Sequence, residues 1–328
     1  MTKEPKVVIA LSIYKPNVKW LEELLNSLNE QTYENIELLI WNDCPEDSFD
    51  YEVFIKKRIY NFPFLYKKAE INLGANKAFE SLTNLAEGDY IAYCDQDDIW
   101  LSDKLKKMVN YLQIREIDLV GCCLKIIDGE SRETNKLIKP RLLPTKKIDM
   151  FETLLMHAWI NGCAMLVKLD MAKQALPFPD VKSAYYDWWI SLYVSTYGKI
   201  GMVDDCLIKY RVYGNNTSTV IYIDKEDYYN NRLLEFNNKI NAIKDRFLCR
   251  EQQEIINNVI NYSINRINYF KNHTLINAYK LFKNRRFNKK AVYYELLQPL
   301  IPSKIFVYFI NRYMSTRLIE ISVKELLK

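Results

Sequence analysis

The first hundred residues alternate between short apolar runs and helical patterns, and this alternation is the feature that most constrains the fold. Residues 7–13 form a continuous run of β-branched and aliphatic side chains, and leucines at helical spacing follow between residues 21 and 28. This order predicts a strand and then a helix. It recurs with strands expected at 36–41, 64–66 and 90–94, a helix at 51–58, and a helix ending at 85 after a turn at 72–74. Such alternation predicts an α/β fold with a parallel sheet.

The rest of the chain continues this pattern and then changes. We expect a helix at 102–114, a strand at 118–127, a loop at 136–147, a strand opened by Asn161 and Gly162 that runs to 167, and a partly buried helix at 185–197. From about residue 223 the pattern is helical and rich in Asn, Tyr, Ile and Lys. We therefore predict two domains, residues 1–220 and residues 221–328.

Three carboxylates follow the strand expected at 90–94, because Asp95, Asp97 and Asp98 surround Gln96. Carboxylates this close repel one another, and hard oxygen ligands suit Mg²⁺ or Mn²⁺ bound together with a phosphate. In an open α/β sheet, ligands bind outside the carboxyl ends of the strands. The pattern therefore favours a site for a nucleotide diphosphate. The alternative is a solvated acidic turn in which Asp98 caps the following segment.

The composition narrows the chemistry that this chain can perform. His157 and His273 are its only histidines, so a histidine-rich metal site or a Ser-His-Asp triad has little material. The seven cysteines show no Cys-x-x-Cys spacing, no secretory leader opens the sequence, and no run of about 18 apolar residues occurs. These features predict a cytoplasmic protein with reduced thiols and with chemistry that depends on carboxylates.

Seven short motifs, taken together, resemble the family 2 glycosyltransferases of the GT-A fold. They occupy residues 7–14, 42–43, 72–74, 88–91, 95–100, 187–189 and 210–211. The resemblance covers about residues 5–217 and is strongest to bacterial cell-surface polysaccharide and rhamnosyltransferase-like members. It implies a Rossmann-like, mostly parallel mixed sheet flanked by helices, followed by a mainly α-helical C-terminal extension.

The same resemblance implies an inverting, metal-dependent reaction. A sugar, with rhamnose among the candidates, would move from a UDP- or dTDP-sugar to a glycan or lipid-linked acceptor, and Mn²⁺ or Mg²⁺ would assist. Asp97 would bind the metal directly, and Asp95 would reach the metal or the ribose. Residues expected around the nucleotide sugar are Ser12, Tyr14, Asp43, Asn72, Lys77, Asp95 and Arg211.

Several of these residues have plainer alternatives. Asp43 would accept the N3–H of the uracil or thymine base, but an Asp at a strand end also forms turns. Lys77 fits a solvated helix lysine equally well. Arg211 would hold a phosphate bidentately or pair with a carboxylate of the protein.

By resemblance, Asp187 would be the catalytic base, since direct transfer with inversion needs one carboxylate to take the proton of the acceptor hydroxyl. The alternative is an N-cap on the aromatic helix. Asn161 and Gly162 would line the acceptor site, or form a simple turn. Trp188 and Trp189 offer faces on which a sugar could stack, or they fill the core.

Two positions depart from the family pattern. Many relatives have a histidine just before the catalytic Asp, where this chain has Tyr186, and another shortly after the Tyr-Arg pair, where it has Tyr213. A phenol titrates near 10 and is a poor metal ligand at neutral pH. Metal coordination is therefore expected to rely on Asp97, the diphosphate and water, or metal dependence is expected to be weak.

Residues 221–328 carry 19 Lys and Arg against 10 Asp and Glu, whereas the first 220 residues carry 27 against 31. The surplus gathers in the basic residues between 280 and 290, close to aromatic and aliphatic side chains. This pattern favours peripheral contact with the inner face of a bacterial plasma membrane; the alternatives are a solvated helical surface or a homodimer interface. No module typical of nucleic-acid binding accompanies the charge.

Two other functions compete with sugar transfer. One is a non-catalytic subunit that binds nucleotide sugars. The other is a sugar-1-phosphate nucleotidyltransferase, but such enzymes usually have a glycine-rich loop after the first strand, and residues 12–16 contain no glycine.

Overall fold

The computed structural model describes residues 4–139, 144, 146–213 and 221–318, and the chain divides into two compact units. The first unit comprises Met1–Leu143, Ala158–Phe178 and Tyr185–Tyr213, and the second comprises Pro144–His157, Pro179–Ala184 and Gly214–Lys328. Pro144–His157 and Pro179–Ala184, which the sequence predicts for the first domain, thus group with the second unit. The expected boundary near residue 220 falls within 214–220, outside the described residues.

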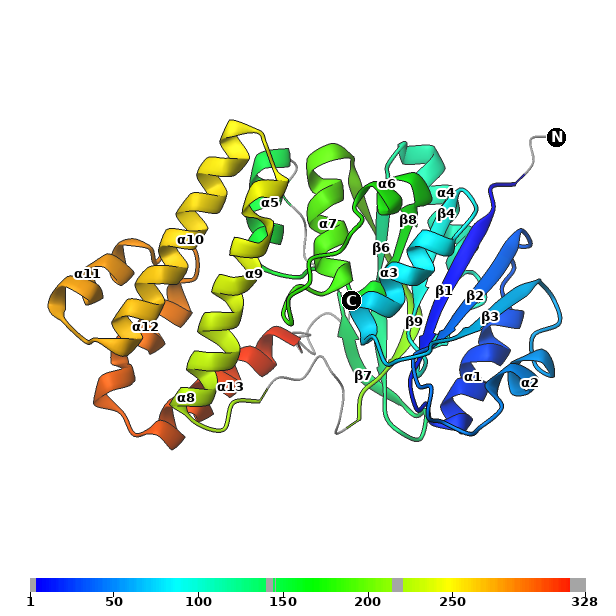
Figure 1. Cartoon of the computed structure of the whole chain (residues 1–328), viewed down its shortest axis with the longest axis horizontal. Coiled ribbons are helices and arrows are strands. Elements are labelled where there is room, and N and C mark those ends of the chain that lie inside the picture. The colour runs from blue at the N-terminus through cyan, green and yellow to red at the C-terminus, as the bar shows by residue number, and fades with distance from the viewer. Residues whose placement is uncertain (1–3, 140–143, 145, 214–220, 319–328) are drawn as a thin grey trace. The chain divides into compact units, whose positions relative to one another are not determined.

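The first unit is built on one mixed sheet with the strand order β3-β2-β1-β4-β8-β6-β9-β5, and β7 pairs with β6 (Figure 1). The strands are β1 (Val7–Ile13), β2 (Ile36–Asn42), β3 (Phe64–Lys68), β4 (Tyr90–Cys94), β5 (Ile99–Trp100), β6 (Leu119–Ile127), β7 (Glu133–Ile138), β8 (Met165–Lys168) and β9 (Ile200–Arg211). The pairs β1–β2, β1–β4, β2–β3 and β6–β9 are parallel. The pairs β4–β8, β5–β9, β6–β7 and β6–β8 are antiparallel.

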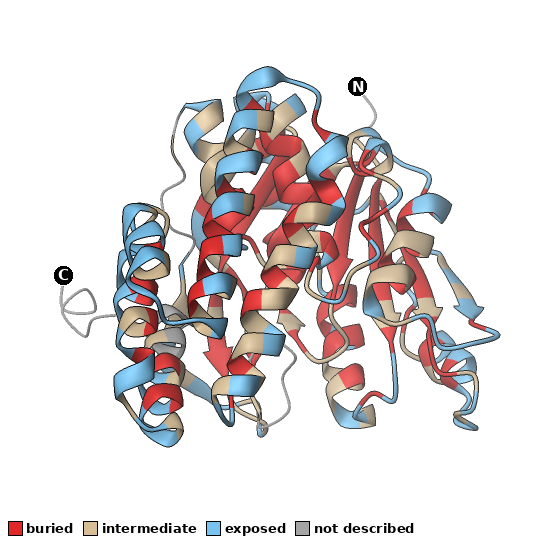
Figure 2. Ribbon diagram, turned by 60° about the vertical axis from the view of Figure 1, so that its left-hand side comes forward, coloured by how far each residue is buried: buried red, intermediate tan, exposed pale blue. Residues whose placement is uncertain are grey.

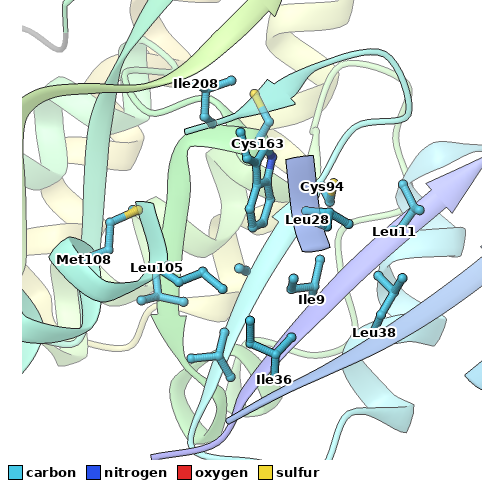
Figure 3. Packing of buried hydrophobic residues seen from close by; sticks show 14 of the residues in the cluster. Ile9, Leu11, Leu28, Ile36, Leu38, Cys94, Leu105, Met108, Cys163 and Ile208 are labelled. Carbon is cyan, nitrogen blue, oxygen red and sulfur yellow. The ribbon is translucent and has the colours of Figure 1, made fainter. Parts of the chain in front are cut away.

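Helices cover both faces of this sheet. They are α1 (Val18–Asn29), α2 (Tyr51–Lys56), α3 (Ala75–Leu85), α4 (Lys104–Arg115), α6 (Leu169–Gln174) and α7 (Tyr186–Tyr197). Alternate residues of β1 and β2, such as Ile9, Leu11 and Leu38, pack with the leucines of α1 and with α4 in one buried cluster (Figure 3). On the other face, α3 contacts β1, α6 and α7. The result is the predicted α/β layering, in which the strands β1, β4 and β6 are buried on both sides.

The second unit is helical within the described residues. Its helices are α5 (Lys147–Met156), α8 (Lys225–Tyr228), α9 (Glu235–Ile243), α10 (Arg250–Lys271), α11 (Leu275–Lys283), α12 (Lys289–Leu297) and α13 (Ser303–Leu318), with a π-helical segment at Tyr229–Leu234. A buried ion pair between Arg266 of α10 and Glu295 of α12 lies beside the hydroxyl of Tyr228. Figure 2 shows how buried and exposed positions alternate along these helices. In the part of the chain described here, no helix is long and apolar enough to cross a bilayer.

Two expectations about secondary structure need correction, and one long strand was missed. The predicted loop at 136–147 begins inside β7 and ends in α5, and its residues 140–143 and 145 lie outside the described residues. The strand expected from Asn161 starts only at Met165, because Gly162–Ala164 forms a 3₁₀ turn. The long strand β9 was not predicted. Its pairing with β6 is interrupted around Asp204 and Asp205. The alternation of apolar and polar residues that marks a strand is therefore broken there.

Candidate functional site

The carboxyl ends of β1, β2 and β4 meet at one edge of the sheet, as parallel strands require. The backbone N–H of Asp43 donates to the carbonyl of Ile13 over 2.8 Å, which joins the loops after β2 and β1. The side chain of Gln96 joins the loops after β4 and β1, because it accepts from the N–H of Tyr14 at 2.7 Å and donates to its carbonyl at 3.1 Å. The structure thus gathers the predicted rim residues, including half-buried Ser12. The contribution of Gln96 was not foreseen.

Asp43 organises the turn before α3. Its carboxylate accepts the backbone N–H groups of Leu73 and Gly74 at 3.0 and 2.8 Å, and its carbonyl accepts from the Asn72 side chain at 2.9 Å. Gly74 has φ +78°, which only glycine adopts readily. This buried geometry fits the turn-forming alternative, and the contact of Asp43 with a base stays a prediction. Lys77, one turn into α3, pairs with Glu80 at 2.9 Å, and its contact with a nucleotide also stays a prediction.

The acidic turn after β4 carries three carboxylates that differ in how far they are buried. Asp95 and Asp97 keep part of their surface, whereas Asp98 is fully buried. Burial is the main cause that raises the pKa of all three carboxyl groups. The pKa of Asp95 rises to about 7, because the negative charges of Asp97 and Asp187 add to the effect of burial. Asp187 thus lies within electrostatic reach of the turn.

A cation would relieve this repulsion, and the donor set suits one. Oxygens of Asp95 and Asp98 and the sulfur of Cys163 lie within 4.8 Å of one another. Oδ2 of Asp98 is buried without a hydrogen-bond partner among the described residues. However, Asp98 and Cys163 are almost inaccessible to solvent, so the carboxylates that a nucleotide-bound ion would meet are Asp95 and Asp97. Carboxylate oxygens are what Mg²⁺ and Mn²⁺ prefer.

The end of β9 and the residues after it hold the acidic turn in place through hydrogen bonds. Arg211 donates its backbone N–H to Asp98 at 3.0 Å and its Nε–H to the carbonyl of Asp97 at 2.8 Å. Two residues later, the hydroxyl of Tyr213 donates to Oδ2 of Asp97 at 2.8 Å. Tyr213 thus stands where relatives often have a histidine, and it contacts the predicted metal ligand as a hydrogen-bond donor.

The guanidinium of Arg211 is fully buried and has further partners within the protein. It forms an ion pair with Glu23 of α1 at 2.6 Å and donates to Ser131 and to the carbonyl of Asp128. This arrangement fits the alternative of an internal ion pair. Contact of Arg211 with a phosphate stays a prediction. The sequence offered no sign of Glu23, which precedes Arg211 by 188 residues.

Asp187 is the second residue of α7 and not its N-cap, which is Tyr185. Its carboxylate accepts the N–H of Gly162 at 3.2 Å and that of Trp188 at 2.7 Å. A carboxylate in the first turn of a helix is stabilised by the helix dipole. Gly162, expected to line the acceptor site, and Asp187, the expected base, are therefore direct neighbours.

Gly162 is required by the tyrosine that precedes Asp187. A Cβ at this position would lie 1.9 Å from the hydroxyl oxygen of Tyr186. The Tyr186 ring is itself buried between Phe79 and Tyr93, at centroid distances of 4.2 and 4.9 Å. Tyr186 thus fixes the approach of the Gly162 turn to α7.

Trp188 and Trp189 are buried, with 2% and 1% of their surfaces exposed, and the indole N–H of Trp189 donates to the carbonyl of Ala175. This burial argues against stacking on an acceptor sugar and fits the core-filling alternative. Asn161 is half-buried at the start of the turn that contacts Asp187. Its place in an acceptor site stays a prediction.

Comparison with known sequences gives a consistent result. Residues 9–171 match the family model described as glycosyl transferase family 2. An uncharacterized glycosyltransferase of Methanocaldococcus jannaschii is 29% identical over 232 residues, which cover 69% of this chain and 77% of that protein. The minor teichoic acid biosynthesis protein GgaB of Bacillus subtilis is 26% identical over 72% of this chain, but over only 26% of its own length.

Solved structures extend the likeness in fold to nearly the whole chain. Residues 1–349 of S. aureus TarS, crystallised in complex with UDP-GlcNAc, match 95% of this chain and 90% of that chain with a TM-score of 0.58 and 16% identity. The mannosyltransferase PcManGT of Pyrobaculum calidifontis, solved with GDP-Man and Mn²⁺, matches 97% of this chain and 85% of that chain with a TM-score of 0.54 and 16% identity. At such identities the likeness concerns the fold.

Proposed function

This chain belongs to the family 2 glycosyltransferases and has their GT-A fold, and from that premise we propose that it transfers a sugar from a UDP- or dTDP-sugar to a glycan or lipid-linked acceptor in surface polysaccharide synthesis. The complex of TarS with UDP-GlcNAc and the naming of GgaB for teichoic acid biosynthesis support the class of donor and the process. Rhamnose is among the candidate sugars.

The observation that best supports this function is the convergence of Asp95, Asp97 and Asp187. After burial, the charges of Asp97 and Asp187 are the largest causes that raise the pKa of Asp95. Glycosyl transfer needs carboxylates for two purposes. Some bind the cation that neutralises the diphosphate, and one acts as the base that deprotonates the acceptor. Three neighbouring carboxylates meet both needs.

Asp95 and Asp97 would hold the divalent cation, because they are the partly exposed members of the acidic turn. Mn²⁺ or Mg²⁺, when bound there, would neutralise the diphosphate as it leaves the sugar. The hydroxyl of Tyr213, which donates to the carboxylate of Asp97, and the Nε–H of Arg211, which donates to its carbonyl, would keep this residue in place. The structure of PcManGT with Mn²⁺ is consistent with such a requirement.

Asp187 would accept the proton of the acceptor hydroxyl while the oxygen attacks the anomeric carbon from the face opposite the diphosphate. A single base and a single displacement invert the configuration. The N–H groups of Gly162 and Trp188 orient the Asp187 carboxylate. Asn161 would lie at the acceptor side, next to this turn.

The test is nucleotide release from a panel of UDP- and dTDP-sugars in the presence of Mn²⁺, with the anomeric configuration of the product determined by NMR. Asp187→Asn should lower turnover at least about 100-fold, as expected for loss of a general base, and Asp97→Asn should weaken both turnover and metal binding. Asp170→Asn, at an exposed position of α6, is the matched control.

Two results would contradict this proposal. Undiminished turnover in both variants would exclude the assigned roles of Asp97 and Asp187. Binding of a nucleotide sugar by the native protein without any release of nucleotide, with every acceptor tried, would instead identify a non-catalytic binding subunit.

A further inference from the structure

Helix α11 presents an apolar face to solvent. Leu275, Ile276 and Tyr279 are 89%, 67% and 60% exposed, and Phe282 is also exposed. Residues 275, 279 and 282 lie on one side of the helix, and Leu281 is the fully buried residue that anchors the other side. Isolated exposed apolar residues are ordinary, but a contiguous face of this kind marks a site of interaction.

This face continues onto the next helix. The ring of Phe282 lies 6.4 Å from that of Tyr293 in α12. Tyr293 and Leu297 are exposed one turn apart, and Leu300 beyond them is 79% exposed. The exposed apolar residues of α11, of α12 and of the 3₁₀ turn Gln298–Leu300 that follows it therefore form one surface, which we name the α11–α12 face.

Positive charge borders the α11–α12 face. Six basic residues occur between 280 and 290, and no Asp or Glu occurs between 255 and 294. Four of the six line a hollow of about 400 Å³: Lys283, Arg285, Arg286 and Lys289. The next acidic residue, Glu295, is buried and already paired with Arg266. Among the described residues, the one acidic group recorded near these cations is Glu152, 4.0 Å from Arg286.

We propose that the α11–α12 face docks peripherally on an anionic membrane surface. Leu275, Ile276 and Tyr279 would enter the boundary between headgroups and acyl chains, while Lys283 and Arg285 would contact lipid phosphates. An exposed apolar helix face next to unbalanced basic residues has the chemistry of an interfacial helix. This inference does not rest on the proposed sugar transfer, because it can be tested without any donor.

Two other occupants fit the same surface less well. In a symmetric pair of chains, each basic cluster would face the other across the two-fold axis. The acidic residue of α11 and α12, Glu295, is buried and paired with Arg266, so it would not balance them. A nucleic acid would be attracted by the charge, but the most exposed apolar residues, Leu275 and Leu300, have no aromatic ring to stack on bases.

The experiment is cosedimentation of the full-length protein with vesicles of phosphatidylcholine alone or of equal parts of phosphatidylcholine and phosphatidylglycerol. The native protein should bind the anionic vesicles more tightly, and added salt should weaken this binding. Each basic residue near an anionic surface contributes about fivefold in affinity, so the triple variant K283E/R285E/K289E should bind at least about 100-fold more weakly. The variant L275S/Y279S should lose binding at high salt as well as low salt.

Matched controls separate these effects from general changes of the surface. K56E/K57E/K106E reverses three exposed charges in the first unit, and Leu248→Ser removes an 87% exposed leucine elsewhere in the second unit. Both should bind vesicles like the native protein, and thermal unfolding should show that all variants are folded. Equal binding of native and charge-reversed protein, or no preference for anionic vesicles, would overturn the proposal. It would also be overturned if L275S/Y279S changed only the oligomeric state measured by light scattering, since the face would then join copies of the chain.

Discussion

Replacing Gly162 by alanine tests whether the approach of the Gly162 turn to α7 positions the carboxylate of Asp187. The new Cβ would lie 1.9 Å from the hydroxyl oxygen and 2.4 Å from the ring carbon that bears it in Tyr186. The ring cannot swing aside freely, because Phe79 and Tyr93 pack against it. Overpacking of this kind costs about 1–3 kcal/mol of unfolding free energy, which corresponds to a fall in Tm of roughly 2–12 °C for a unit of this size.

The same substitution should also lower the catalytic rate, by a larger free-energy equivalent than the loss of stability. The N–H of Gly162 donates to Asp187, so a shift of the turn would move the base, and a misplacement of about 1 Å can cost about 100-fold in rate. We expect reduced kcat with little change in the binding of the nucleotide donor. Differential scanning calorimetry and initial rates of nucleotide release measure the two effects.

Gly129→Ala is the control for this prediction. The nearest atom to a Cβ at Gly129 is a ring carbon of Trp20 at 3.8 Å, which is ordinary contact. This variant should keep the Tm and kcat of the native protein. If Gly162→Ala behaved in the same way, Tyr186 could relax without consequence, and its proposed part in positioning Asp187 would be refuted.

Three further predictions concern the charges of the two units. Since the pKa of Asp95 is about 7 in the absence of metal and ions bind its deprotonated form, Mn²⁺ affinity measured by calorimetry should fall about tenfold per pH unit below 7 and level off above it. Tyr213→Phe removes a hydrogen bond to Asp97 and should weaken Mn²⁺ binding by about tenfold or more. Glu295→Gln leaves the buried charge of Arg266 without its ionic partner and should cost about 3–5 kcal/mol in denaturant unfolding.

Each of these predictions has a matched control. Asp187→Asn should move the pH profile of Mn²⁺ binding to lower pH, because it removes one of the charges that raise the pKa of Asp95. Tyr60→Phe, at a 78% exposed tyrosine, should leave metal affinity unchanged. Glu254→Gln, in an exposed pair with Arg250, should change stability by less than about 0.5 kcal/mol. A flat pH profile, or equal effects of target and control, would contradict the corresponding prediction.

The parallel half of the sheet could be predicted from the sequence because its signals are local. The apolar run of β1 and the leucines of α1 lie within thirty residues of each other, and each has the period of its own element. β9 could not be predicted in the same way. Asp204 and Asp205 interrupt its pattern, and its twelve residues are held by pairing with β6, a partner that only the tertiary structure reveals.

The candidate site likewise contains one part with a local sequence signal and another part that depends on distant residues. The acidic turn after β4 is evident from the sequence, since a buried strand rarely ends in three carboxylates without a reason. What fixes that turn is distant: Arg211 and Tyr213 follow Asp98 and Asp97 by 113 and 116 residues. A sequence motif can therefore indicate which side chains bind a cation, while the partners that orient them become visible only in the folded chain.

Tyr213 shows how these distant contacts change the interpretation of a departure from the family pattern. From the sequence, a tyrosine in place of a histidine suggested the loss of a metal ligand. In the structure its hydroxyl donates to Oδ2 of Asp97, and its ring packs on Trp20 with centroids 4.6 Å apart. A donor at Oδ2 leaves the other oxygen of Asp97 to a cation and opposes the rise in the pKa of this carboxyl that burial causes. The substitution is thus compatible with a metal site in which Tyr213 acts on the ligand and not on the ion.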